Sequence, residues 1–536
     1  MTLPDRQQFS FYLYFLGLIV LVFSLPLSKF GMSIAQIGIA ISWVISGDFK
    51  NKFKTFFASR IALLLTSVFF LHVAGLIWTT DFVYAWKDIR IKAPLFLMPL
   101  LLSTSPRLSK KQFEVILYTL IAGVVLSTLI SMMVYFGWIR KEVHDIRDIS
   151  IFISHIRLVL IGCVAIFASV WLVYQNGSNQ PGRYTWLHGL VVCWLAFFIF
   201  FIQGLTGIVV LSASFLLLML LLMTRTKSQT RRILYAMVAI VPVIMMVWSI
   251  FSVTRMMNPS AETGSKVPEK YTLSGREYVH QPERKEYENG NPVWMYICEE
   301  ELRSQWNARS DFDFDGRDQL NHELKMTLLR FMSSKGLKKD SAGVWSLNNE
   351  DIKAIESGIA NEFYLNRLDP RTRMHQVAWE IQNYLHGGDP SGHSVAQRLE
   401  YWKAAVGIIN KNQLFGVGTG DVPQAFKTQY EEIDSRLSEK WRLRSHNQYL
   451  SFAVAFGLAG LIWFLYTLWV PALHAFRARN YLYLFFALAA AISMITEDTL
   501  ETQAGVTFFA LFSTLFLFVC PQKDDIDGNP GNLPSR

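Results

Sequence analysis

The chain has 536 residues, of which 51% are hydrophobic and only 17% are charged. A soluble protein of this length would carry about a quarter charged residues, so the composition argues against a soluble enzyme and indicates a membrane protein. The formal net charge of +9 fits basic cytoplasmic loops better than nucleic-acid binding. There is no CxxC pair among the four cysteines, so neither a disulfide framework nor a cysteine-based metal site is supported.

Apolar runs near the length of a bilayer-spanning helix recur along most of the chain and predict an all-α polytopic membrane protein with about 12 transmembrane helices. The fourth run is short, and only Gln203 and Gly204 separate the seventh from the eighth, so the count could differ by one or two. The first run has no small-x-small cleavage site and is interpreted as a retained anchor. The expected spans are 9–25, 30–46, 61–79, 92–104, 112–138, 156–174, 186–202, 205–223, 233–252, 447–470, 481–496 and 504–520.

These runs divide the chain into four parts. Spans 1–9 occupy residues 1–252, a polar stretch with amphipathic helical patterns fills 253–445, spans 10–12 occupy 446–520, and a disordered tail covers 521–536. Short loops on one side of the predicted membrane carry most of the basic residues, including Lys50, Arg107, Arg225 and Arg477. Basic loops stay in the cytoplasm, so both termini are expected there and the large loop, 253–445, is expected outside.

A few cations fall on the outer side and so violate this rule. Arg90 and Lys92 precede the fourth span, and Arg157 stands at the outer edge of the sixth. Such cations are balanced by nearby acids, extend to the membrane interface, or bind an anion. Asp88 can balance the first pair, which leaves Arg157 as the stronger candidate for contact with a ligand.

Three motifs follow one another at the end of the large loop. The segment RLEYW at 398–402 opens an amphipathic helix, and FGVGTGD at 415–421 is too rich in glycine to continue it. The segment RSHNQYL at 444–450 then leads into the tenth span, which places His446 at the outer membrane boundary.

In this order and at this place, the motifs resemble the O-antigen ligase and O-antigen polymerase family. Its pattern is an arginine, a tryptophan a few residues later, an amphipathic helix, a Gly-x-Gly turn, and His-Asn-x-Tyr-Leu entering a span that continues with Gly-Leu-x-Gly, here Gly457-Leu-Ala-Gly460. The resemblance covers about 398–465. It implies a glycosyltransferase that moves a glycan from undecaprenyl pyrophosphate to a glycan or lipid acceptor, such as lipid A-core, at the periplasmic face of the bacterial inner membrane.

The chain departs from this family pattern at one place. The family has a Ser-Arg-Gly-like element at the outer start of a span before the large loop, whereas this chain has QGLTG at 203–207. Our hypothesis is that Arg157 supplies the missing charge from the neighbouring span.

The resemblance assigns roles to particular residues. Arg398, Arg157 and Arg90 are expected to bind the donor pyrophosphate, because a guanidinium donates bidentately to phosphate and stays charged. His446 is expected to be the general base that takes a proton from the acceptor hydroxyl, and direct attack would invert the anomeric centre. Neither a metal nor another cofactor is required if arginines stabilise the leaving group.

Further residues can support this site. Glu497, Asp498 and Glu501 lie where the eleventh span reaches the outer side, and together with Asn447 they can orient the base or pair with arginines. Trp402 and Tyr449 can stack on a sugar, although aromatic residues are common at membrane interfaces. Simpler interpretations stay open: a cap for His446, a pair with Glu400 for Arg398, and a solvated turn for the acids.

Other interpretations compete with a ligase. A polymerase or a protein O-oligosaccharyltransferase of the same family differs only in its acceptor. We prefer the ligase because the large loop is expected to face the acceptor. A polysaccharide transporter or flippase would show internal repeats and residues at mid-membrane, which the sequence does not show. A non-catalytic scaffold is a third possibility.

The segment at 311–316, DFDFDG, begins like a calcium loop, but His322 replaces the usual final glutamate, so calcium is not expected.

Overall fold

The computed structural model describes residues 5–143, 146–175, 185–257, 268–284, 286–366 and 370–521. The predicted tail, 521–536, lies outside these residues except for Pro521. The chain forms two compact units: residues 1–242 with 397–536, and residues 243–396. The candidate site residues all belong to the first unit.

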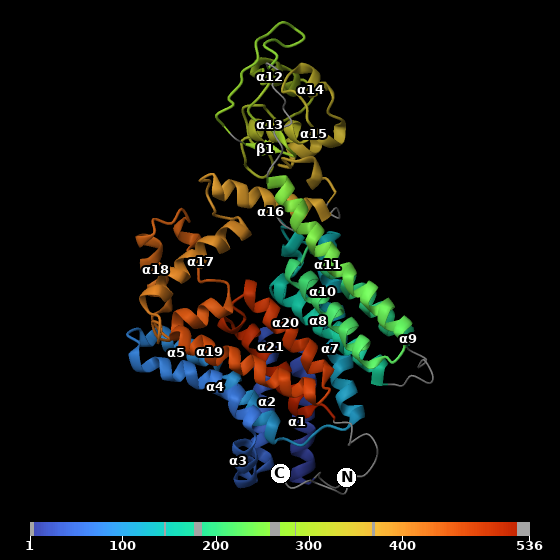
Figure 1. Cartoon of the computed structure of the whole chain (residues 1–536), viewed down its shortest axis with the longest axis vertical. Helices are drawn as coiled ribbons and strands as arrows, with labels where there is room; N and C mark the ends of the chain where they lie inside the picture. The colour runs from blue at the N-terminus through green and yellow to red at the C-terminus, as the bar shows by residue number, and fades with distance from the viewer. Residues whose placement is uncertain are drawn as a thin grey trace. The chain divides into compact units, whose positions relative to one another are not determined.

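Helices make up the first unit (Figure 1). The predicted all-α polytopic membrane fold is supported, because eight helices within the described residues are long and apolar enough to cross a membrane: α1, α2, α4, α7, α8, α10, α11 and α19. Three shorter apolar helices accompany them: α9, α20 and α21. The helices of this unit are α1 (Arg6–Ser24), α2 (Lys29–Ser46), α3 (Phe49–Ala58), α4 (Arg60–Ala74), α5 (Phe82–Lys92), α6 (Pro94–Thr104), α7 (Lys110–Tyr135), α8 (His155–Gln175), α9 (Thr185–Phe201), α10 (Leu205–Arg225), the first half of α11 (Gln229–Met257), most of α17 (Ser394–Lys411), α18 (Val422–Glu432), α19 (Gln448–Arg477), α20 (Tyr481–Thr496) and α21 (Gln503–Thr514).

Among the described residues, eight helices have spanning length, fewer than the predicted count of about 12 spans. The expected fourth span, 92–104, contributes only the 11-residue helix α6, which begins at Pro94 and contains Pro99. Proline has no N–H to continue a helical ladder, so the chain breaks between Lys92 and Pro94 and starts a new helix. Lys92 is therefore the last residue of α5 and not the first of a span.

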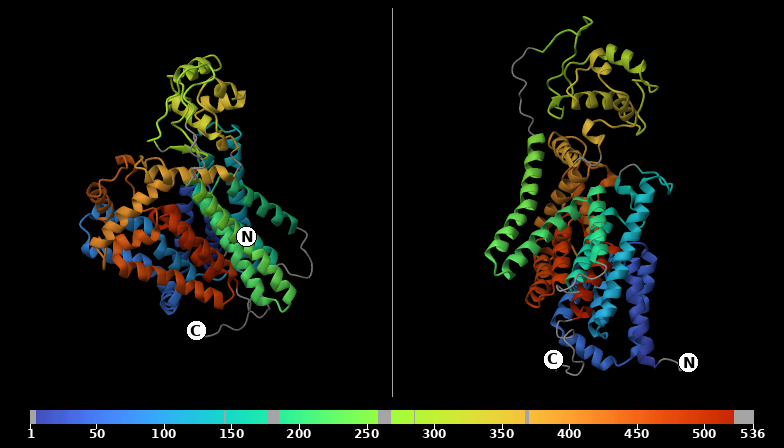
Figure 2. Two further views of the ribbon diagram at one scale, coloured as in Figure 1. Left: turned by 45° about the horizontal axis from the view of Figure 1, so that its top comes forward. Right: turned by 90° about the vertical axis from the view of Figure 1, so that its right-hand side faces the viewer.

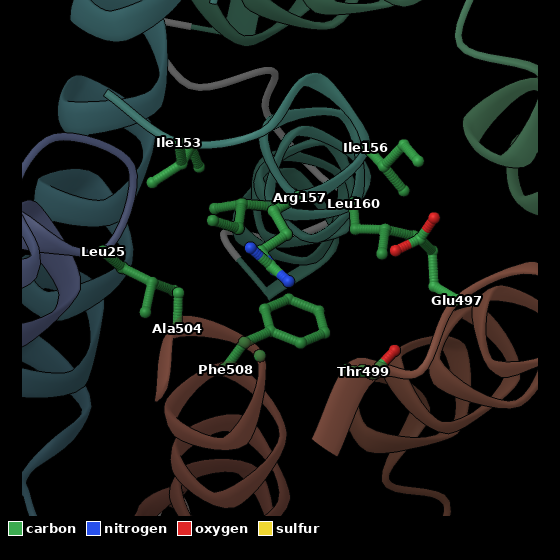
Figure 3. A pocket seen from close by; sticks show the side chains of 11 residues that line it. Leu25, Ile153, Ile156, Arg157, Leu160, Glu497, Thr499, Ala504 and Phe508 are labelled. Atoms are coloured by element: carbon green, nitrogen blue, oxygen red, sulfur yellow. The ribbon is translucent and has the colours of Figure 1, made fainter. Parts of the chain in front are cut away.

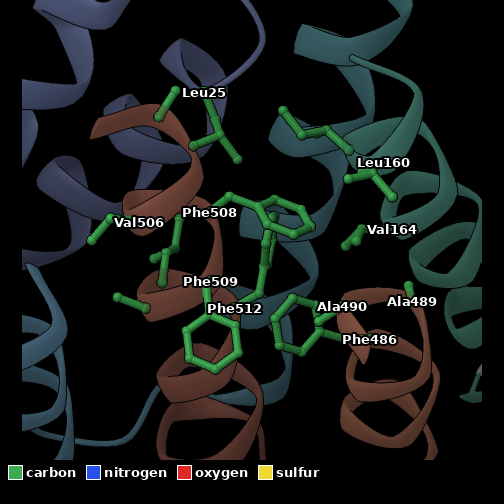
Figure 4. Close-up of a cluster of buried hydrophobic side chains, with 14 of the residues drawn as sticks. Leu25, Leu160, Val164, Phe486, Ala489, Ala490, Val506, Phe508, Phe509 and Phe512 are labelled. Atoms are coloured by element: carbon green, nitrogen blue, oxygen red, sulfur yellow. The ribbon is translucent and has the colours of Figure 1, made fainter. Parts of the chain in front are cut away.

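Helices from both ends of the sequence are interleaved in the first unit (Figure 1 and Figure 2). α4 contacts α19, α6 contacts α21, and α8 contacts α20. Figure 4 shows one part of the shared core, where Phe508 and Phe512 of α21 meet Phe486 of α20 and Leu160 of α8. This packing fixes the short connection between α20 and α21 in place.

The second unit has its own hydrophobic core, in which Trp306, Phe314, Leu328 and Phe331 are fully buried. Two short antiparallel strands and five helices surround it: β1 (Tyr287–Glu288), β2 (Asn291–Pro292), α12 (Glu299–Asn307), α13 (Leu324–Ser334), α14 (Ser341–Trp345), α15 (Asn349–Glu356) and α16 (Pro370–Leu385).

Two acids in or just after the calcium-like segment have protein partners. Asp315 pairs with Arg303 at 2.8 Å. Asp318 accepts hydrogen bonds from the backbone N–H of His322 and from Thr327 Oγ1. These contacts make the segment a hydrogen-bonded turn.

A kink in α19 connects two of the glycine motifs. Gly457 interrupts the helix with φ +65°, and Leu458 N–H donates to the carbonyl of Gln413 at 2.7 Å. The carbonyls of Val454 and Ala455 accept instead from the N–H groups of the glycine turn, 417 and 418, at 2.9 Å. The turn at 415–421 thus satisfies backbone groups that the kink releases.

We predict that Gly457→Ala destabilises the protein by at least about 2 kcal/mol, because a side chain at positive φ is strained. Its Cβ would also lie 2.2 Å from the carbonyl oxygen of Leu414. The measurement is the thermal unfolding midpoint in detergent. Gly38→Ala is the matched control, since a Cβ there meets nothing within 4 Å. Equal midpoints for the two variants would show that the kink is not required.

Candidate functional site

His446 lies in the short segment that enters α19. Its backbone has φ +46°, a left-handed conformation that is uncommon for a residue other than glycine. The two neighbours fix it there: Asn447 caps α19 by accepting from Leu450 N–H at 3.1 Å, and Ser445 Oγ donates to the carbonyl of Asn447 at 2.9 Å. The imidazole lies beside the ring of Tyr401, with centroids 5.4 Å apart. The local backbone therefore holds the imidazole in one place.

Asp498 is the carboxylate nearest to the imidazole. Its Oδ1 lies 3.7 Å from His446 Nδ1, which is too long for a hydrogen bond but close enough for a strong electrostatic effect. His446 Nδ1 is buried and has no hydrogen-bond partner among the described residues. Arg444 holds the other oxygen of Asp498, with Nε 3.5 Å from Oδ2.

Glu497 faces a different arginine. Arg398, on α17, lies with its terminal nitrogen 3.3 Å from Glu497 Oε1, and its Nε–H donates to the carbonyl of Thr496 at 3.2 Å. Arg398, Glu497, Asp498 and His446 thus lie in one cluster. Glu400, the alternative partner considered for Arg398, accepts from Ser435 Oγ.

Glu501 is the centre of a buried ionic cluster. Its Oε2 lies 2.9 Å from Lys92 Nζ and 2.9 Å from Arg444, and its Oε1 accepts from Gln448 Nε2 at 3.2 Å. Lys92 is fully buried and also contacts Asp88 at 2.6 Å. Removing any one member would leave an unpaired charge in a low-dielectric environment.

Burial and the neighbouring charges shift the pKa of the His446 imidazole. Burial lowers the pKa of His446; Asp498 opposes this shift, while Arg398 and Arg444 add to it. Burial also raises the pKa of Asp498, which Arg444 and His446 oppose. At neutral pH the imidazole is therefore uncharged and able to accept a proton.

The two glutamates differ in protonation although they are four residues apart. Burial raises the pKa of Glu497 to about 7, because Arg398 offsets the burial only in part. Burial acts in the same direction on Glu501, but Lys92 and Arg444 outweigh it and lower the pKa to about 2. Glu501 is thus a permanent anion, whereas Glu497 can take up a proton near neutral pH.

Arg157 faces an apolar pocket. Figure 3 shows its guanidinium reaching from α8 toward Phe508, with Glu497 beside it. The pocket is lined by Leu25, Ile153, Ile156, Arg157, Leu160, Ile161, Glu497, Thr499, Ala504, Gly505 and Phe508. Arg157 and Glu497 are therefore the two charged groups in a lining that is otherwise mostly apolar.

The segment at 203–207 packs against α8, the helix that carries Arg157. A Cβ on Gly207 would lie 2.0 Å from the side chain of Val159, two residues after Arg157 on α8. Thr206 Oγ1 lies 3.1 Å from Thr496 Oγ1, next to Glu497. The place where the resemblance expected an arginine thus packs against α8 and against Thr496, the neighbour of Glu497.

The three remaining candidates from the sequence, Arg90, Trp402 and Tyr449, lie in different surroundings. Arg90 is exposed on α5, on the face opposite Lys92, and the structure does not bring it to His446. Trp402 is half-buried and donates from Nε1 to the carbonyl of Ser445 at 3.1 Å, so it supports the loop that carries His446. The hydroxyl of Tyr449 donates to the carbonyl of Ala491 at 2.8 Å.

Two site residues were missed from the sequence. Arg444 stands two residues before His446, in the motif that enters α19, and its pairing with Asp498 and Glu501 follows only from the fold. Lys92 was noticed as a cation on the wrong side of the membrane, but its pairing with Glu501 was not anticipated.

His446, Glu497 and Asp498 also offer ligand atoms within 4.8 Å of one another, close enough to hold a metal ion. However, two of the three ligands already pair with guanidinium groups, Glu497 with Arg398 and Asp498 with Arg444. A divalent cation would have to displace or repel these positive charges. The charge distribution favours an anionic ligand over a cation.

Comparison with known proteins adds an independent finding. Residues 352–465 match the family model described as O-antigen ligase. The matched range includes Arg398, the glycine turn, His446 and Gly457. No curated protein matches the chain. The match agrees with the family resemblance seen in the motifs: residues 352–465 of this membrane protein are similar to the O-antigen ligase family.

Proposed function

We propose that this chain is an inverting, metal-independent glycosyltransferase of the O-antigen ligase type. Its donor is a glycan on undecaprenyl pyrophosphate, and its acceptor is a sugar hydroxyl of lipid A-core or a similar glycan. The observation that carries the proposal is the cluster at the ends of apolar helices, where a half-buried imidazole with a lowered pKa lies beside Asp498, and Arg398 binds the adjacent Glu497. A base and an anion-binding guanidinium are the two groups that this transfer needs.

The donor pyrophosphate would take the place that Glu497 now occupies beside Arg398 and Arg157. Glu497 has a pKa of about 7, so it can be protonated as a more strongly charged anion replaces it. The two guanidinium groups then stabilise the charge that develops on the leaving pyrophosphate. The apolar surface next to Arg157 accepts the start of the lipid chain.

His446 would remove the proton from the acceptor hydroxyl as its oxygen attacks the anomeric carbon. The bond from that carbon to the pyrophosphate oxygen breaks on the opposite side, so the anomeric configuration inverts. Asp498 stabilises the imidazolium that forms, and Asn447 holds the loop. Glu501 acts indirectly, since it positions Arg444 against Asp498. Trp402 and Tyr449 are proposed as weaker sugar contacts.

The position in the cell follows from the same reasoning. We infer a multi-pass protein of the bacterial inner membrane, with 253–445 in the periplasm, because the basic short loops lie at the opposite ends of the spans. The large loop would then face the acceptor. A polymerase or a protein O-oligosaccharyltransferase would use the same donor and residues, and the acceptor alone separates them from a ligase.

Reconstitution with a pyrophosphate-linked donor and candidate acceptors tests the function. We expect His446→Ala and Arg398→Ala each to lower the rate of glycan transfer at least about 100-fold. The first removes the proposed general base, and the second removes a guanidinium that would stabilise the leaving pyrophosphate. His474→Ala, at the other end of α19 and exposed, is the control. Transfer by both site variants at the control rate, with folding intact, would refute the proposal. Inactivation by EDTA would refute the metal-free route.

The pH profile tests the role of Asp498. Because His446 acts in its uncharged form, kcat/KM should fall as pH falls through the His446 pKa. Asp498 raises that pKa, so Asp498→Asn should move the acidic limb to lower pH and reduce the plateau about tenfold or more. Asp434→Asn, an exposed isosteric change, is the control. A limb that does not move would exclude electrostatic contact between Asp498 and the base.

Donor titration tests the role of Arg157. Arg157→Ala should raise the KM for the lipid-linked donor at least about tenfold, and Arg157→Lys should recover only part of the loss, since lysine cannot make the bidentate contact. Arg477→Ala, exposed at the far end of α19, should behave like the wild type. Undiminished transfer by Arg157→Ala would remove the hypothesis that this residue replaces the family arginine.

A further inference from the structure

Helix α5 has two faces of opposite character. The buried face carries Ala85, Asp88, Ile89 and Lys92, and it leads into the ionic cluster around Glu501. The other face is exposed and carries three large apolar side chains and two cations: Phe82, Val83, Trp86, Lys87 and Arg90. The exposed fractions of the apolar three are 61%, 86% and 64%. A helix of 11 residues with this division suits an interface and not a span.

The cations on the exposed face have no acid opposite them. Among the described residues, neither Lys87 nor Arg90 forms a salt bridge. Asp88 is directed to the buried face and pairs with Lys92, while Asp81 caps α5 by accepting from Tyr84 N–H at 2.9 Å. The exposed face is therefore positively charged as well as apolar.

The position of α5 in the chain places this face at a membrane boundary. The candidate span that contains α4 ends at Trp78, four residues before α5 begins. Ile77, in that last turn, is 84% exposed and continues the apolar surface. Aromatic side chains at such a boundary lie at the depth of the headgroups, where lysine and arginine reach phosphate groups.

We propose that the exposed face of α5 docks on anionic phospholipid headgroups of the leaflet on the site's side of the membrane. Phe82, Val83 and Trp86 insert between the headgroups, while Lys87 and Arg90 contact their phosphates. The opposite face of the same helix delivers Lys92 to Glu501, so the lipid contact sets the depth at which the ionic cluster lies. This docking does not depend on which reaction the site performs.

Native mass spectrometry of the full-length protein tests the docking. The protein is purified in detergent with added phosphatidylglycerol or phosphatidylcholine, and the retained lipid is counted. We expect preferential retention of phosphatidylglycerol by the wild type, reduced at least about fivefold in the double variant Lys87→Gln/Arg90→Gln. High salt should reduce retention in the wild type but not in the variant. The matched control removes two exposed lysines of the same unit, Lys403→Gln/Lys427→Gln.

Three results would overturn the proposal. Equal retention of the two lipids by the wild type would show that no anionic headgroup is recognised. Unchanged retention in Lys87→Gln/Arg90→Gln would place the lipid elsewhere. Loss of a dimer mass in the variant would show that the face binds a second copy of the chain. Both changed side chains are exposed, so unaltered thermal unfolding midpoints should accompany each measurement.

Discussion

The site depends on the pairing of three buried acids with three cations. Glu497, Asp498 and Glu501 lie within five residues of one another in the sequence, and each charge must find a partner because an isolated ion in a low-dielectric interior is very costly. Arg398, Arg444 and Lys92 provide those partners from α17, from the segment before α19, and from α5. The pairing therefore forces three distant segments to meet beside His446. The lowered pKa of His446 depends in part on that convergence, because Asp498, Arg398 and Arg444 all act on it.

A second constraint comes from the backbone and not from charge. The kink at Gly457 leaves carbonyls of α19 without their helical donors, and the turn at 415–421 supplies N–H groups to them. The two glycine motifs that contribute to the family resemblance are therefore one structural unit. Gly416 and Gly457 each allow a close approach of backbone to backbone that a side chain would prevent. The same turn also contacts the start of α5, where Asp421 accepts from the N–H of Thr80 at 2.8 Å.

Much of this arrangement could be predicted from the sequence, for identifiable reasons. Long apolar runs indicated the membrane helices, and the spacing of the loop motifs placed His446 at the entry to α19. Arg90 was predicted to bind the donor, whereas the structure buries Lys92 beside Glu501 and leaves Arg90 exposed. The two residues lie on opposite faces of α5, and the phase of that helix was hidden because 92–104 resembled a span. Pro94 ends one helix and starts another, which an apolar composition does not reveal. The strained backbone at His446 is likewise set by tertiary contacts with Ser445 and Asn447.

The connection between α20 and α21 has a consequence for natural variation. Surface connections usually tolerate insertions and deletions, because their length matters less than that of the elements they join. Here a 3₁₀ turn, Thr499–Glu501, aims carboxylates four residues apart at different cations. Adding or deleting a single residue would rotate one carboxylate away from its partner while leaving the others in place. Relatives that keep this chemistry should therefore keep the length of this connection unchanged, even where its other side chains differ.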